Sequence, residues 1–330
     1  MPTDTLHRPR PAPDTLDPFP ETCTCPPVVR YACGHCWHGQ CLDCGMCADT
    51  GCVCHCSLGF APATATGPQF WLGGHHPRWL STWGVPMCVS RNTLAARASL
   101  PRAAEEWICD SGAFTEIDRH GRWTVTPRQY VRDIRRYRDE IGLLAWAGPQ
   151  DMMCEPDMIA RTGLSVARHI DATVGNFLDL MALDDTLPIR PTVQGWTVKD
   201  YESCADLYER RGVDLAAYPV VGVGSICRRT SIRQPVAILS TLAARGLHLH
   251  GYGLKGDALT ACAEWLTSAD SMAWSRDARW EAARTGPLPQ CVGKHKSCAN
   301  CVHWAMRWRE DILAALSTPR QMPLPLGETR

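Results

Sequence analysis

The chain has 330 residues, of which 45% are apolar, so it is long enough for one large α/β domain with a small appendage. Its 34 basic and 34 acidic residues give a formal net charge of zero, so no bulk field draws it toward nucleic acid or membrane. No run of 18 apolar residues occurs, which excludes an ordinary transmembrane helix.

Residues 1–20 are rich in proline, threonine and aspartate and contain no apolar stretch of the kind that a signal peptide needs. We expect this segment to be disordered. Without an export signal we expect the protein to be cytoplasmic and not bound to a membrane. In that compartment, clustered cysteines favour a metal site over disulfides.

Residues 21–58 form a cysteine-rich segment that holds ten of the 19 cysteines. Thiolates separated by one or two residues can hold a tetrahedral ion, and this short, aliphatic-poor segment needs metal to fold. Two structural Zn²⁺ ions fit the ligand count best; an iron–sulfur cluster and a disulfide knot are the alternatives, and the pairing of the thiols is left open. The predicted ligands are Cys23, Cys25, Cys33, Cys36, Cys41, Cys44, Cys47, Cys52, Cys54 and Cys56.

From residue 70 onward, short apolar runs alternate with amphipathic stretches, which is typical of repeated β–α units. The predicted strands are 85–90, 107–110, 143–147, 189–194, 220–224, 247–251 and 268–272. The predicted helices are 127–141, 158–183, 199–211, 232–245, 257–266 and 300–316. We therefore expect an α/β fold, a (β/α)8 TIM-type barrel over residues 68–318, with an eighth strand in the C-terminal third and a tail over 319–330. An open, doubly wound sheet is the alternative.

Polar residues and glycines gather where the predicted strands end, and in a barrel those ends carry the active site. Asp110 and Asp270 each follow an apolar run, and they are 160 residues apart. Two carboxylates brought together from distant strand ends predict chemistry at one carbon, with one acid attacking and the other transferring protons. Asp151 and Gln194 end two further strands, and glycines such as Gly222 permit close approach of a flat ligand.

Several motifs, in their order along about residues 70–309, carry a family resemblance. They are Gly73-Gly74-His75-His76-Pro77, Val85-Pro86-Met87-Cys88-Val89-Ser90, Asp110-Ser111-Gly112-Ala113-Phe114, Gln194-Gly195, Gly222-Val223-Gly224-Ser225 with Arg228-Arg229, Asp270-Ser271, and Cys298-Ala299-Asn300-Cys301. Together they resemble the tRNA-guanine transglycosylase superfamily (queuine tRNA-ribosyltransferase-like). They look closest to its DpdA-type branch, which inserts 7-deazaguanine bases into DNA.

The resemblance implies a role for each matching residue. Asp270 would be the nucleophile at the anomeric carbon, and Asp110 would be the acid/base. Phe114 would stack on the purine, and Asp151 would bind its Watson–Crick edge. The other implied substrate-binding residues are Ser111, Gln194, Gly195, Gly222, Val223, Gly224, Arg228 and Arg229; the two arginines are candidates for phosphate contacts.

The chain departs from the family pattern at two kinds of position. Ala113 and Thr115 replace a glycine and a glutamine of the family motif. The C-terminal zinc ligands would be Cys291, His295, Cys298 and Cys301, with His303 as a competitor, which is not the spacing of the tRNA enzymes. These departures weaken transfer of the tRNA substrate more than transfer of the reaction.

The resulting hypothesis is a pentosyltransferase that exchanges guanine in DNA for a free 7-deazaguanine base of the 7-cyano-7-deazaguanine type. Structural zinc would be its only metal, and a helper protein is a further candidate partner. A transglycosylase acting on tRNA is the alternative within the enzyme class. A zinc-dependent nucleic-acid-binding adaptor with an inactive barrel is the alternative from another class.

Overall fold

The computed structural model describes residues 67–288, 291 and 297–317. The ten cysteines of the predicted N-terminal metal-binding segment lie outside these residues, as do His295 and the predicted tail. Among the described helices none is long and apolar enough to span a membrane.

The described part is built on one sheet of eight parallel strands in the order β4-β3-β2-β1-β8-β7-β6-β5. Its strands are β1 (Gln69–Gly74), β2 (Met87–Ser90), β3 (Trp107–Asp110), β4 (Leu144–Ala147), β5 (Thr192–Val193), β6 (Val221–Val223), β7 (Leu249–Gly251) and β8 (Leu266–Ser271). Apart from the β1–β8 pair, all neighbours in the sheet are consecutive in the chain, which is the order that a β/α barrel requires.

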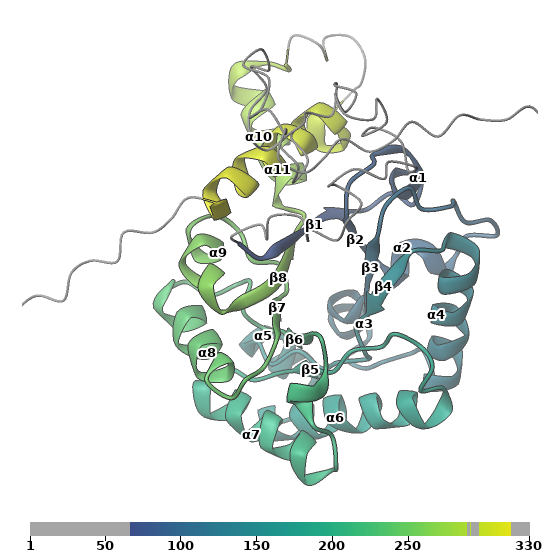
Figure 1. The fold of residues 1–330 in the computed structure, drawn as a ribbon, viewed down its shortest axis with the longest axis vertical. Helices are drawn as coiled ribbons and strands as arrows, with labels where there is room; N and C mark the ends of the chain where they lie inside the picture. Colours follow the sequence, from purple (N-terminus) through teal and green to yellow (C-terminus); the bar gives the residue numbers. More distant parts are fainter. Residues whose placement is uncertain (1–66, 289–290, 292–296, 318–330) are drawn as a thin grey trace, which may run out of the picture. The chain divides into compact units, whose positions relative to one another are not determined.

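The two edge strands of this sheet come back toward each other. Ala147 at the end of β4 forms a parallel bridge with Ile189, just before β5. The Ala147 N–H donates to the Pro188 carbonyl, and the Arg190 N–H donates to the Ala147 carbonyl, both at 2.9 Å. The sheet therefore curls on itself into a TIM-like α/β fold, with helices α4 and α6–α9 around its outside (Figure 1).

Helices follow the strands, and side-chain caps mark the start of α4, α6 and α7. The described helices are α1 (Trp79–Thr82), α2 (Arg91–Ala95), α3 (Ala113–His120), α4 (Pro127–Ile141), α5 (Pro156–Thr162), α6 (Val166–Leu183), α7 (Val198–Arg210), α8 (Arg233–Ala243), α9 (Gly256–Cys262), α10 (Ala273–Thr285) and α11 (Val302–Ser317). In α4, Pro127 occupies the first turn, where its missing N–H costs nothing, and Thr126 accepts from the Gln129 N–H. In α7, Thr197 and Asp200 form a reciprocal capping box.

Alternate residues of each strand pack on opposite faces of the sheet. The large cluster between sheet and helices includes Leu72, Val89 and Cys109. A separate cluster contains the residues of the opposite parity, namely Trp71, Cys88, Ile108 and Trp146, together with Val220. This second set fills the inside of the curled sheet, so the barrel is a packed core that supports a site at the strand ends.

The structure corrects three expectations. The eighth strand is β1, the first in the described chain, and not a strand in the C-terminal third. The sequence did not indicate this strand because it ends in two glycines. Glycine is required at position 73, because a Cβ there would lie 2.6 Å from the Met272 Cβ. The helix expected over 158–183 is two helices, because Gly163 ends α5 with a φ of 69° and Ser165 caps α6. Helix α10 was not expected at all.

Candidate active site

Strand register brings the two predicted catalytic aspartates to the same end and face of the sheet. Asp110 is the last residue of β3 and pairs with Ser90, and Asp270 in β8 pairs with Trp71. Both therefore continue the inward-facing rows below them. The buried thiol of Cys88 lies close to both aspartates and is hydrogen-bonded to Asp270. Burial is the largest cause that raises the pKa of this thiol well above its usual value, and the charges of Asp270 and Asp110 are the next largest.

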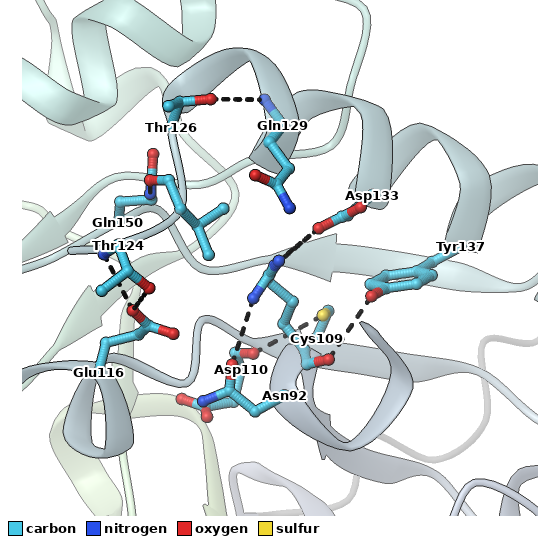
Figure 2. A network of polar contacts seen from close by, with 12 residues as sticks. Asn92, Cys109, Asp110, Glu116, Thr124, Thr126, Gln129, Asp133, Tyr137 and Gln150 are labelled. Carbon is cyan, nitrogen blue, oxygen red and sulfur yellow. Dashed lines mark hydrogen bonds and ion pairs between the residues drawn. The ribbon is translucent and has the colours of Figure 1, made fainter. Parts of the chain in front are cut away.

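The turn after β3 holds Asp110 in place. The Gly112 N–H donates to Asp110 Oδ2 at 3.0 Å, and Gly112 has a φ of 80°, in the region that favours glycine. The Asn92 amide donates to the Gly112 carbonyl at 3.0 Å. Arg91 is 4% exposed; it donates to Asn92 and forms an ion pair with Asp133 of α4 (Figure 2). A buried polar network thus ties the Asp110 turn to the helix outside it.

The surroundings of Asp110 raise the pKa of its carboxyl group. Burial is the main cause that raises its pKa to about 7, and the negative charges of Asp151 and Asp270 add to it. Hydrogen bonds from the Gly112 N–H and the Ser90 side chain oppose the rise in pKa. A carboxyl group that titrates near neutral pH can both give and take a proton, as a general acid/base must.

Asp270 is held by a different set of neighbours. Its Oδ1 accepts from the Gly253 N–H at 3.0 Å and lies 3.3 Å from His250 Nε2. The His250 ring is fully buried, and its Nδ1 lies 2.8 Å from the Ser268 hydroxyl. These contacts fix one carboxylate oxygen and so the direction of the other. The sequence carried no sign of the contact between His250 and Asp270, which depends on the pairing of β7 with β8, where His250 lies opposite Ser268.

A second buried group joins three more of the predicted residues. The Ser111 hydroxyl donates to Asp151 Oδ1 at 2.8 Å, and the Gln194 amide donates to Asp151 Oδ2 at 2.6 Å. Burial is the largest cause that raises the Asp151 pKa, against the two hydrogen bonds that lower it. Since the charge of Asp151 also raises the pKa of Asp110, these residues belong to one site.

The predicted glycines make room for side chains in this site. A Cβ on Gly224 would lie 2.1 Å from Gln194 Nε2, and one on Gly222 would lie 2.5 Å from the Tyr252 ring. The N–H groups of Gly222 and Gly224 donate within the sheet, and the Val223 carbonyl accepts from the Tyr252 N–H.

Gly195 likewise permits close packing against α7. A Cβ there would lie 2.8 Å from the backbone nitrogen of Tyr201. The structure therefore shows how the four predicted residues Gly195, Gly222, Val223 and Gly224 pack within the site. Their contact with a ligand stays a prediction.

Two arginine–aromatic pairs lie beside these strand ends. The Arg228 guanidinium lies 4.2 Å from the centre of the Phe114 ring and pairs with Asp157 at 3.0 Å. Phe114 is 41% exposed, so it can still take a ligand. Arg229 instead lies 3.8 Å from the Trp196 ring centre and donates to the carbonyls of Ser225 and Trp196. Arg228 is thus the more available of the two for a phosphate.

Three of the four predicted C-terminal zinc ligands are described, and they are buried in one cluster: Cys291, Cys298 and Cys301. The sulfurs of Cys291 and Cys301 are 3.2 Å apart. A set of clustered thiols is the donor chemistry that Zn²⁺ prefers. However, among the described residues no group of three or more His, Cys, Asp or Glu has a geometry able to hold a metal. The zinc site, including His295, remains a prediction.

The fold and the strand-end carboxyl groups define an α/β barrel protein with the layout of an enzyme. A family model for DpdA, "DeoxyPurine in DNA protein A", matches residues 67–323. The chain therefore belongs to the DpdA family, as its motifs predicted. A comparison with curated protein sequences gave no match.

Solved structures show only distant similarity. A proposed isomerase from Sinorhizobium meliloti is 13% identical with a TM-score of 0.35; the match covers 62% of this chain and half the length of that one. The YdjI aldolase from Escherichia coli K12 is 12% identical over 76% of this chain and 91% of that one, with a TM-score of 0.37. A 2,3-dimethylmalate lyase of the PEP mutase/isocitrate lyase superfamily is 13% identical over 75% and 95%, with a TM-score of 0.31.

Proposed function

We propose that this protein replaces guanine in DNA with a free 7-deazaguanine base by double displacement through a covalent bond between Asp270 and the sugar. The observation that carries the proposal is the pairing of unlike carboxyl groups. Asp110 has a pKa of about 7, while Asp270 is held by the Gly253 N–H and the His250 ring. Retaining glycosidases also use two carboxyl groups in this way: one exchanges protons, and the other attacks the sugar.

In the first half-reaction, a carboxylate oxygen of Asp270 attacks C1′ of the target nucleotide. The bond between C1′ and N9 breaks, its electron pair goes to the leaving guanine, and protonated Asp110 supplies the proton that neutralises the base. The target base must leave its stack to reach the site, which costs a few kcal/mol in a duplex.

In the second half-reaction, the incoming 7-deazaguanine gives its N9 proton to the Asp110 carboxylate. Its N9 then attacks C1′ and displaces Asp270, which returns as a carboxylate. The bonds broken and formed are alike, so the cycle needs no external energy source. The proton balance returns Asp110 to its starting state.

The remaining site residues would bind the two bases in turn. Asp151 and Gln194 would read the amino and N–H groups of the purine edge, and Ser111 would hold Asp151 in place. Phe114 would stack on the purine ring, with Arg228 on its surface near a phosphate of the DNA. The bonds within this group support the proposal because they hold the polar atoms in fixed positions before a base arrives.

Zinc would have a structural role, held by the C-terminal ligands Cys291, His295, Cys298 and Cys301, and it would supply folding energy and no chemistry. The cysteine-rich segment over 21–58 would bind further zinc. The protein would act in the cytoplasm.

The test is to incubate the protein with radiolabelled guanine and either DNA or tRNA, and to measure which polymer gains label. We expect label in DNA, and a denaturation-resistant protein–DNA adduct that Asp270→Asn does not form. Asp277→Asn, which removes an exposed acid on α10, is the matched control and should behave as the wild type.

The outcomes separate the rival functions. Label in tRNA alone would replace the DNA assignment by the tRNA enzyme. Absence of label from both polymers, with nucleic-acid binding retained, would favour the adaptor. An adduct that persists in Asp270→Asn would remove Asp270 from the role of nucleophile.

A further inference from the structure

Behind Asp151 and Gln194 lies a chain of buried polar groups that the proposed reaction does not use. The Gln194 amide oxygen lies 2.7 Å from the Ser225 hydroxyl, and that hydroxyl lies 2.7 Å from Glu155 Oε2. Asp151, Gln194, Ser225 and Glu155 are each at most 7% exposed. We call these four residues the relay.

The hydrogen atoms of the relay cannot all be placed if both of its carboxyl groups are ionised. Ser225 has one hydroxyl hydrogen and accepts a further bond from the Cys154 N–H at 2.8 Å. It therefore donates either to Gln194 or to Glu155, but both contacts are as short as hydrogen bonds. Two oxygen atoms that face each other at 2.7 Å without a hydrogen repel, so a further proton must belong to the relay.

That proton has two possible positions, and they go with opposite orientations of the Gln194 amide. If Glu155 carries it, Glu155 donates to Ser225, Ser225 donates to the Gln194 oxygen, and the Gln194 nitrogen donates to an ionised Asp151. If Asp151 carries it, Asp151 donates to the Gln194 oxygen, the Gln194 nitrogen donates to Ser225, and Ser225 donates to an ionised Glu155. The two states differ only in which carboxyl group is neutral and in the rotation of one amide.

The backbone of Ser225 is an independent sign that this hydroxyl has a function. Ser225 has a φ of 54°, in the left-handed region where a non-glycine side chain is strained. Glycine would relieve the strain but would lose the hydroxyl. Strain of this kind is found where a side chain is needed for binding or catalysis. Here the strained backbone directs the hydroxyl between Gln194 and Glu155.

We propose that Ser225 and Glu155 determine base specificity by setting whether Asp151 meets the base as an ionised or as a neutral acceptor. This inference rests on the proposed function, in which Asp151 and Gln194 bind the base. Guanine and 7-deazaguanines present two donors on this edge, N1–H and the 2-amino group, so they select the state with Asp151 ionised and the proton on Glu155. An acceptor at N1 is repelled by an ionised carboxylate, so a purine with such an N1 favours the state in which Asp151 is neutral and its proton bonds to the Gln194 oxygen.

The test compares guanine with 2-aminopurine, which keeps the 2-amino group but has an acceptor at N1. Equilibrium dialysis of each radiolabelled base against the full chain gives the ratio of the two affinities. Glu155→Gln takes the exchangeable proton out of the relay, so Asp151 stays ionised and the preference for guanine should rise by about tenfold. Ser225→Gly leaves the Gln194 oxygen without its donor, so the preference should fall by about tenfold.

Changes of the affinity ratio in opposite directions in the two variants indicate a role in specificity. A purely structural role would weaken the binding of both bases together. Ser225→Gly suits the positive φ, so loss of folding does not obscure the result. Glu116→Gln is the matched control, because Glu116 is also buried but accepts from the N–H and hydroxyl of Thr124 and is not part of the relay, and its ratio should equal that of the wild type.

An unchanged ratio in Glu155→Gln, or changes in the same direction in both variants, would overturn the relay while leaving base exchange intact. Wild-type protein that selects guanine through the relay but transfers no label to a polymer would refute base exchange and leave the relay standing. Wild-type protein that binds both bases equally would overturn the inference.

Discussion

The raised pKa of Asp110 predicts a measurable effect on stability as well as on catalysis. Its pKa is about 7 in the folded protein, against a usual value of 3.8. Between these two values the folded state binds more protons than the unfolded state, so stability falls as pH rises. One pKa unit corresponds to about 1.36 kcal/mol, so raising the pH from 5 to 8 should remove about 2.7 kcal/mol of the free energy of unfolding.

Asp110→Asn removes this dependence, because asparagine keeps the shape of the side chain but does not titrate. The stability of the variant relative to the wild type should therefore increase by about 2.7 kcal/mol between pH 5 and pH 8. Urea unfolding followed by circular dichroism at both pH values measures it. Asp277→Asn controls for the loss of one charge at the surface, where ion pairs contribute little. A stability difference between Asp110→Asn and the wild type that is the same at both pH values would refute the reasoning.

Three further changes test other parts of the site. Gly224→Ala would place a Cβ 2.1 Å from Gln194 Nε2, so guanine binding in dialysis should weaken at least tenfold, whereas Gly175→Ala, with open space around it, should bind normally. His250→Asn should slow formation of the covalent adduct about tenfold or more with little change in guanine affinity; equal loss of both would contradict a role in orienting the nucleophile. Cys298→Ser should lower the zinc content measured by elemental analysis by about one ion per chain, and an unchanged content would remove Cys298 from the ligand set.

Much of the fold was predictable because its signals are local. The strand at 107–110 and the helix at 127–141 were predicted with the bounds that the structure has, since the strand is a short apolar run and the helix has proline at its start and glycine after its end. Strand β1 was missed because its glycines read as a loop, and their need for close packing against Met272 exists only in the folded chain. Local signals end where packing between distant segments decides the structure.

The same limit applies to the site. Asp110, Asp151 and Asp270 were found because acids after apolar runs stand out in a sequence. Glu155 was missed because it precedes Pro156 at the start of a helix, where a glutamate has an ordinary capping role. Its contact with Ser225 joins residues 70 positions apart, and only the arrangement of the strand ends makes it.

The differences among the three aspartates follow from what surrounds each of them. Asp270 receives a backbone N–H and faces a histidine, and these neighbours hold one of its carboxyl oxygens in place. Asp110 lies near two other acids, and loss of solvent together with their charges raises the pKa of the same chemical group to about 7. Asp151 is bonded to Ser111 and Gln194, and Gln194 links it through Ser225 to Glu155. If all three were ionised together, their mutual repulsion in a buried site would oppose folding. The proton on Asp110 and the proton in the relay reduce that repulsion. The protonated carboxyl groups that the reaction would use therefore also allow the three aspartates to lie close together.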